Sequence, residues 1–229
     1  MIELYLDLIS PPCRAVFLFA KALGIPFEFK YVDLNAGQQY SSEFGKLNIV
    51  VKIPVMKDGG FTLSESTAIL KYLVQKYSGS VADHWFPHAN LRGHCQKVFL
   101  LGVRTLFPVI MGLEVPEVTM DAALENMKQS LNLLEEKFLQ NKQFILGDKI
   151  SVADVVAVVE IMQLLGTGVD GFEGCPKPIA WRVLLKEELG EELMDDAHKA
   201  LMQLSGLPEK LKSSSEFQKF KLRLQRFFN

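Results

Sequence analysis

The chain is poor in cysteine, and its three cysteines (Cys13, Cys95 and Cys175) stand at unrelated spacings. An odd number so spaced does not form the disulfide framework that small secreted domains use. The first seven residues, MIELYLD, hold two acids and no base, unlike the basic start of a secretory signal peptide. These features predict a cytoplasmic location.

Long apolar runs and an excess of charge of one sign are also absent. The longest apolar run, around Val155–Val159, is interrupted by Glu160, so no segment is predicted to cross a membrane. The formal net charge is −2, which gives no reason to expect nucleic acid as a partner. His84, His88 and His94 lack the spacings of zinc ligands, so no metal site is predicted.

The first third of the chain alternates strand and helix patterns. Apolar and polar residues alternate over Ile2–Leu8 and again over Phe27–Val32, as they do in half-buried strands. Between them, Cys13–Leu23 has apolar residues at helical spacing and ends at Gly24. Two strands joined by a helix are expected to pair in parallel.

A hairpin and a second helix follow the polar stretch Asn35–Asn48. Val55–Lys57 and Phe61–Leu63 flank a tight turn at Asp58-Gly59-Gly60. Ser64-Glu65-Ser66 then opens a helix that runs to Lys76. The order predicts a small mixed sheet with helices packed on it, and the turn-rich residues 78–87 are the best candidate for a linker.

Only helical patterns follow the linker. Leu124–Leu139 is amphipathic, and Ser151 with Asp154 has the spacing of a capping box that opens another helix. Helices are also expected near Ile179–Leu189 and Glu191–Leu204. We therefore predict two domains, an α+β domain over residues 1–81 and an all-α helical domain over residues 87–222.

Several blocks of sequence, in this order, resemble those of the cytosolic glutathione transferases of the theta class. They are Glu3-Leu-Tyr-Leu-Asp-Leu-Ile-Ser10-Pro-Pro-Cys13-Arg14, Lys52-Ile53-Pro54-Val55, Phe61-Thr-Leu-Ser-Glu65-Ser66-Thr-Ala-Ile69-Leu70, Phe138-Leu-Gln-Asn141 and Ser151-Val-Ala-Asp154. The likeness covers nearly the whole chain. It implies a thioredoxin-like N-terminal domain with a mixed four-stranded sheet, followed by an all-α domain.

The resemblance implies that Ser10 is the catalytic residue of a transferase that joins reduced glutathione, as co-substrate without another cofactor, to small electrophiles. Ser10 would donate its hydroxyl to the thiolate at the start of the first helix, where free N–H groups and the helix dipole favour an anion. Two other interpretations stay open. Ser10 can simply cap the helix, or Cys13 can be the reactive group of a thiol-disulfide reductase.

The resemblance also implies a set of glutathione-binding residues. Ser66 would hold the γ-glutamyl carboxylate at a helix N-terminus, and Glu65 would take the ammonium group. Ile53, before a cis-proline at Pro54, would pair through its backbone with the cysteinyl part of the ligand. Lys52 and Gln39 would reach the glycine carboxylate. Two alternatives remain: Glu65 and Ser66 can form an ordinary helix N-terminus, and Lys52 can be an ordinary solvated surface residue.

The partners implied are glutathione, small electrophiles and a second copy of the chain in a homodimer. This sequence departs from the resemblance in one segment. Only His88–Phe107 lies between Pro87 and the Phe107-Pro108 pair, which is short of the family's helix by roughly fourteen residues, or about four turns. We therefore expect a weakened dimer. The alternative function is a glutathione-binding module with little catalysis.

Overall fold

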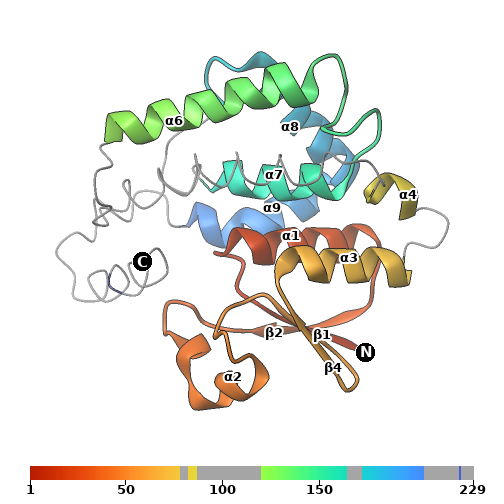
Figure 1. The fold of residues 1–229 in the computed structure, drawn as a ribbon, viewed down its shortest axis with the longest axis vertical. Helices are drawn as coiled ribbons and strands as arrows, with labels where there is room; N and C mark the ends of the chain where they lie inside the picture. Colours follow the sequence, from red (N-terminus) through yellow and green to blue (C-terminus); the bar gives the residue numbers. More distant parts are fainter. Residues whose placement is uncertain (78–81, 87–119, 164–171, 204–221, 223–229) are drawn as a thin grey trace.

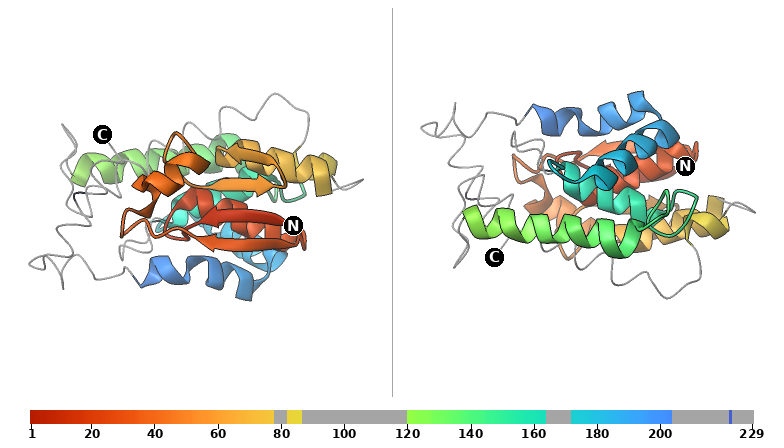
Figure 2. Two further views of the ribbon diagram at one scale, coloured as in Figure 1. Left: turned by 90° about the horizontal axis from the view of Figure 1, so that it is seen from below. Right: turned by 90° about the horizontal axis from the view of Figure 1, so that it is seen from above.

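The computed structural model describes residues 1–77, 82–86, 120–163, 172–203 and residue 222, to which the structural statements below refer. Figure 1 shows a β-sheet with α1 and α3 lying over one of its faces and further helices stacked above α1. In Figure 2, α6 and α9 lie at opposite sides of the molecule, with α1 and α7 between them. The helix α1 is therefore enclosed by the sheet below and by the helical half above.

The N-terminal half contains all of the strands assigned in the described residues. Its elements are β1 (Ile2–Leu6), α1 (Pro11–Ala22), β2 (Phe27–Tyr31), the 3₁₀ turn η1 (Gln38–Tyr40), α2 (Ser42–Leu47), β3 (Val55–Asp58), β4 (Phe61–Ser64) and α3 (Ser66–Tyr77). The described residues of the second half form helices and connecting loops, with an isolated bridge between Phe144 and Gly147. Its elements are α4 (Ala82–Trp85), α6 (Met120–Leu133), the π-helical turn η3 (Leu134–Leu139), α7 (Val152–Met162), α8 (Pro176–Leu189) and α9 (Glu191–Met202).

The sheet has the order β2-β1-β3-β4 and is mixed. The strands β1 and β2 pair in parallel, as the sequence predicts, with Leu6 opposite Tyr31. The strands β1 and β3 are antiparallel, with Tyr5 opposite Val55, and β3 and β4 form the predicted hairpin. Gly59 occupies the left-handed region of its turn (φ 60°), which favours glycine.

The helix α1 is the centre of the molecule. It packs on α3 beside it and on α7 and α9 of the helical half. Its apolar side chains Val16, Leu18 and Phe19 are buried on these contacts. It begins at Pro11, two residues earlier than predicted, because proline at the first helical position needs no N–H partner.

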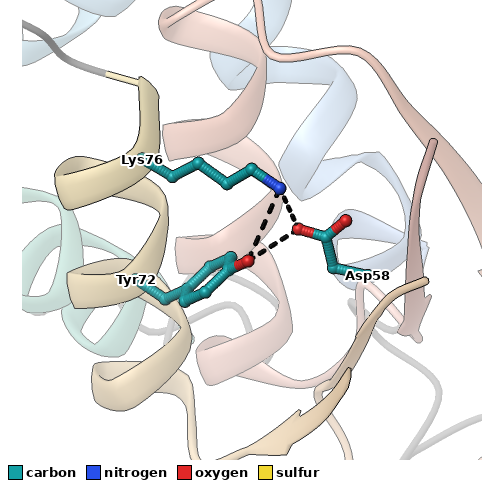
Figure 3. A network of polar contacts seen from close by, with 3 residues as sticks. All are labelled: Asp58, Tyr72 and Lys76. Atoms are coloured by element: carbon teal, nitrogen blue, oxygen red, sulfur yellow. Dashed lines mark hydrogen bonds and ion pairs between the residues drawn. The ribbon is translucent and has the colours of Figure 1, made fainter. Parts of the chain in front are cut away.

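A polar network ties α3 to the end of β3 (Figure 3). The hydroxyl of Tyr72 donates to Asp58 Oδ2 over 2.7 Å, and Lys76 forms an ion pair with the same oxygen. The hydrogen bonds from Lys76 and then Tyr72 lower the pKa of Asp58. The network joins the hairpin to the helix that begins at Ser66.

The predicted capping box at the start of α7 is confirmed. Ser151 N–H and Oγ–H both donate to Asp154 Oδ2, over 2.9 and 2.6 Å. Asp154 Oδ1 accepts hydrogen bonds from Ile145 N–H and from the indole Nε1–H of Trp181. One buried carboxylate thus holds together the preceding loop, α7 and α8.

Two expectations need adjustment. The single helix predicted over Leu124–Leu139 is α6 followed by a π-helical turn. Part of the predicted linker is helical, since α4 places Trp85 edge-on against Phe19 with ring centroids 5.0 Å apart. The shortened segment His88–Phe107 lies outside the described residues. No helix within the described ranges is long and apolar enough to cross a membrane.

Candidate functional site

The pairing of the strands brings the predicted site residues to one end of the sheet. Residues 7–10 follow β1 and residues 32–39 follow the parallel strand β2. Residues 52–54 precede β3, whose first residue pairs with Tyr5, and residues 65 and 66 follow β4, whose last residue pairs with Val55. Segments far apart in the sequence therefore meet beside the N-termini of α1 and α3.

Ser10 occupies the N-cap position of α1 with an extended backbone (φ −81°, ψ 122°). Its side chain makes no capping hydrogen bond, so the simple cap does not account for the hydroxyl. The Ser10 residue is 8% exposed, and its side chain lies within hydrogen-bonding reach of the Cys13 thiol. The hydroxyl does not cap the backbone of α1, although the Cys13 thiol of the same helix lies within its reach.

The backbone at the start of α1 does not offer the free N–H groups that we expected. Pro11 and Pro12 have no N–H, and those of Cys13 and Arg14 donate to Ser10 O over 3.1 and 3.0 Å. The preceding N–H of Ser10 donates to Asp7 O. The expectation was wrong because the two prolines and the first helical turn use up this backbone. What remains for an anion is the helix dipole and the Ser10 hydroxyl.

Cys13 does not have the properties of a nucleophile. It is fully buried, and burial raises the pKa of its thiol to about 12. Reactive cysteines are partly exposed and have a lowered pKa. The structure therefore does not support the thiol-disulfide reductase.

The segment that delivers Lys52 and Ile53 is held by one side chain. Asn48 Nδ2 donates to Lys52 O over 2.8 Å, and Asn48 Oδ1 accepts from Val50 N–H. The Ile53-Pro54 peptide bond is cis, as predicted, and Ile53 is buried while Lys52 is exposed. Val51, just before Lys52, has a φ of 50°, which is unfavourable for a β-branched residue.

The start of α3 has the second strained residue of the site. Glu65 joins β4 to α3 with a φ of 74°, its side chain is exposed, and Ser66 is half-buried. The first intrahelical bond recorded there is that of Ile69 N–H to Glu65 O. The first N–H groups of a helix have no intrahelical acceptor, so the N-terminus of α3, which begins at Ser66, is a place where an anion can bind.

Gln39 lies in η1 and is 7% exposed. Its buried Oε1 has no partner among the described residues. A buried amide without a partner costs free energy unless a ligand or water completes it. Gln39 lies at the same end of the sheet, but its unpartnered Oε1 needs a donor, whereas a carboxylate would have to accept from its Nε2.

Sequence reasoning missed three residues that hold this site in shape. Asp7 accepts Ile9 N–H and Leu34 N–H through its two carboxylate oxygens, and Arg14 donates to Leu8 O and Ile9 O. Asn48 is the third. The signal for Arg14 was present, since it is a charged residue among apolar neighbours of a core helix. No group of three potential metal ligands occurs in the described part of the chain.

Known proteins share this fold and these segments. The family model "Glutathione S-transferase, N-terminal domain" matches residues 4–81, and the model "Glutathione S-transferase, C-terminal domain" matches residues 93–182. Human glutathione S-transferase theta-1 is 43% identical, covering 90% of this chain and 91% of its own.

Two solved structures extend the comparison. Human glutathione-S-transferase T1-1 in its apo form superposes with a TM-score of 0.83 at 38% identity, covering 100% of this chain and 98% of its own. A human theta-class transferase in complex with the glutathione conjugate of 1-menaphthyl sulfate gives a TM-score of 0.82 at 37% identity, with 98% of each chain covered.

The alignment with human theta-1 also bears on chain length. It runs over 223 positions while taking in 90% of this 229-residue chain, so the human protein has residues that this chain lacks. This agrees with a shortened segment somewhere in the chain, without placing it at His88–Phe107.

Proposed function

Since the chain belongs to the theta class of the glutathione S-transferase family, we propose that it conjugates reduced glutathione to small electrophiles, with Ser10 stabilising the thiolate. The thiolate attacks an electrophilic carbon, a C–S bond forms, and the bond to the leaving group breaks. The leaving group, a halide or sulfate, departs with the electron pair, and the thiol proton goes to solvent. The family relationship is the support for the reaction. The geometry of the site supports the roles proposed for the residues.

The environment of Ser10 is the observation that best supports its role. Its hydroxyl is free of the helix cap, whereas the neighbouring backbone N–H groups of residues 9, 10, 13 and 14 are all committed within the chain. A hydroxyl that donates to the sulfur favours the charged form and lowers the thiol pKa from its ordinary value of about 8.5. Each pKa unit gained is worth about 1.4 kcal/mol.

The other proposed contacts bind successive parts of glutathione, from its γ-glutamyl end to its glycine end. Ser66 and the start of α3 bind the γ-glutamyl carboxylate, and Glu65 binds the ammonium group. The backbone of Ile53 pairs with the cysteinyl unit, as an added strand would. Lys52 and Gln39 bind the glycine carboxylate. The backbone strain at Val51 and Glu65 supports this assignment, because strained residues cluster at binding sites.

A binding module with little catalysis is the less favoured function. It was inferred from the shortened segment after the linker, which lies outside the described residues. The matching relatives are named as transferases. The proposal also includes three further points. They are the division into domains over residues 1–81 and 87–222, a weakened homodimer and a cytoplasmic location. The family models, which match residues 4–81 and 93–182, are consistent with the first of these.

The function is tested by two measurements on one preparation. Calorimetric titration with glutathione should show one site per chain. Mass spectrometry should then detect glutathione conjugates from a panel of small alkyl halides and arylmethyl sulfates. Binding with no conjugate from any electrophile would favour the binding module, and the absence of binding would reject the proposal as a whole.

A further inference from the structure

Arg14 is the residue whose contacts extend furthest beyond the site. Its side chain is fully buried between α1 and the helical half of the molecule. Burial lowers its pKa to about 10, so that it keeps its charge at neutral pH. A buried charge of this kind is stable only when its hydrogen bonds are well made.

One guanidinium nitrogen of Arg14 holds the turn that carries Ser10. Its Nη1 donates to Leu8 O over 2.7 Å and to Ile9 O over 2.9 Å. The N–H groups of the same two peptide units, those of Ile9 and Ser10, donate to Oδ1 and to the backbone O of Asp7. Both peptide units before Ser10 are therefore bonded on each side, so their orientation is set by Arg14 and Asp7.

The other nitrogen of Arg14 is held by the helical half. Its Nη2 donates to Val159 O over 3.0 Å and to Gln163 Oε1, both in or at the end of α7. The Nε of Arg14 has no partner among the described residues. The recorded hydrogen bonds of the guanidinium thus join two places only, the turn before Ser10 and α7.

We propose that Arg14 is a positioning residue for Ser10, and that α7 sets the alignment of the Ser10 hydroxyl through Val159 O and the Gln163 side chain. The inference rests on the proposed function, because it assigns to the helical half an influence on the thiolate of bound glutathione. The evidence for this inference is the set of hydrogen bonds that Arg14 makes to the turn and to α7. A hydrogen bond prefers an angle above about 150° at the hydrogen and weakens steeply below about 120°, so a shift of the turn would weaken the bond from Ser10 to the sulfur.

Gln163 offers the cleanest test, because it can be substituted while the residues Arg14 and Ser10 themselves are kept. Gln163→Met removes the acceptor and keeps the length of the side chain. Gln163→Glu keeps an oxygen acceptor and serves as the conservative rescue. Val158→Ala is the matched control, since it creates a cavity at a buried position of α7 whose side chain has no recorded bond to Arg14.

The first readout is the pKa of bound glutathione, followed through the ultraviolet absorbance of the thiolate. Gln163→Met should raise this pKa by about half a unit, which is about threefold less thiolate at pH 6.5. The kcat should fall by a similar factor, while the KM for glutathione stays within about twofold. Gln163→Glu should retain the pKa of the parent protein. Val158→Ala should lower the melting temperature without moving the pKa.

Other ionisable groups face Arg14, and their titration has to be distinguished from that of the glutathione thiol. The groups that interact with its charge are Glu160 of α7, His198 of α9, Asp7 before α1 and Cys13 in the first turn of α1. Burial and then Arg14 lower the pKa of His198 to about 4, outside the range of the titration. Thiolate absorbance does not report the two carboxyl groups or the imidazole, and the Cys13 thiol does not ionise in this range because burial raises its pKa to about 12.

The second readout needs no ligand and separates the two proposals. Amide hydrogen exchange at Ile9 and Ser10 should be faster in Gln163→Met than in the parent protein, and unchanged in Val158→Ala. Faster exchange in a protein that binds no glutathione would reject the function and keep the coupling to Ser10. An unchanged thiol pKa together with unchanged exchange in Gln163→Met would reduce Arg14 to a structural contact between the two halves.

Discussion

The N-termini of α1 and α3 look alike in sequence, because each helix begins beside a serine that follows a strand, yet they present different chemistry. At α1 the prolines and the first turn leave no backbone N–H for a ligand, and only the Ser10 hydroxyl remains. At α3 the helix starts directly after Glu65, which is held at a positive φ. The first turn of α3 holds no proline, so it has the N–H groups without intrahelical acceptors that a helix N-terminus offers to an anion.

The difference indicates that the N-termini of α1 and α3 contribute differently to the proposed function. A carboxylate is fully charged at neutral pH, so the N–H groups and hydroxyl at α3 contribute to affinity. A thiol is mostly protonated at neutral pH, so a single hydroxyl at α1 acts on the equilibrium between thiol and thiolate. Substitutions at α3 should therefore change binding, and substitutions at α1 should change the pKa.

Ser66→Ala should give the largest effect on binding. Removing one donor to a bound carboxylate costs roughly 1.5–3 kcal/mol, so glutathione should bind more than about tenfold more weakly. The pKa of the bound thiol should not change. Calorimetric titration measures the affinity, and wild-type affinity in this variant would remove Ser66 from the site.

Glu65→Gly separates strain from binding at the same helix end. Glycine adopts a positive φ without steric cost, so the free energy of unfolding should rise by up to about 1 kcal/mol. Loss of the exposed carboxylate should weaken glutathione binding by roughly two- to fivefold. Denaturant unfolding and calorimetry give the two numbers. A variant that is less stable and binds normally would contradict both assignments.

Cys13→Ala should leave catalysis almost unchanged. The thiol is buried and its pKa is raised to about 12, so it takes no part in the reaction. The small cavity should cost about 1 kcal/mol of stability. Activity per folded molecule is the quantity to measure, and a loss similar to that of Ser10→Ala would restore Cys13 as a candidate nucleophile.

Dilution should have the smallest effect on glutathione binding. The contacts assigned at both helix ends belong to one chain, so a monomer should bind glutathione as the dimer does. Sedimentation over a wide concentration range should show a dimer that dissociates to a folded monomer. A dimer intact at the lowest concentration would show that other contacts replace the shortened segment, and binding lost on dilution would place part of the site on the partner.

The fold was predictable where local patterns are strong. Alternating strands, the Gly59-Gly60 turn and the Ser151–Asp154 capping box all occur where their patterns place them. The π-helical turn after α6 was not predictable, because its residues Leu134–Leu139 keep helical spacing. The short helix α4 was missed because its four residues lie in a turn-rich stretch.

The residues proposed to contact glutathione could be named from the sequence, and the residues whose hydrogen bonds hold them in place could not. Ser10, Lys52 and Ser66 stand in recognisable blocks of sequence. The hydrogen bonds of Arg14 to Val159 and Gln163 join residues about 145 positions apart, so no local pattern reveals them. The absence of free N–H groups at α1 could have been read from Pro11 and Pro12.

The pKa of bound glutathione in Ser10→Ala, followed by thiolate absorbance, tests the central assignment most directly. Ser10→Thr, which keeps a hydroxyl, is the matched control. In Ser10→Ala this pKa should rise by about one unit or more, while the dissociation constant stays within about threefold of the parent protein. An unchanged pKa in a variant that still binds glutathione would contradict the role of Ser10.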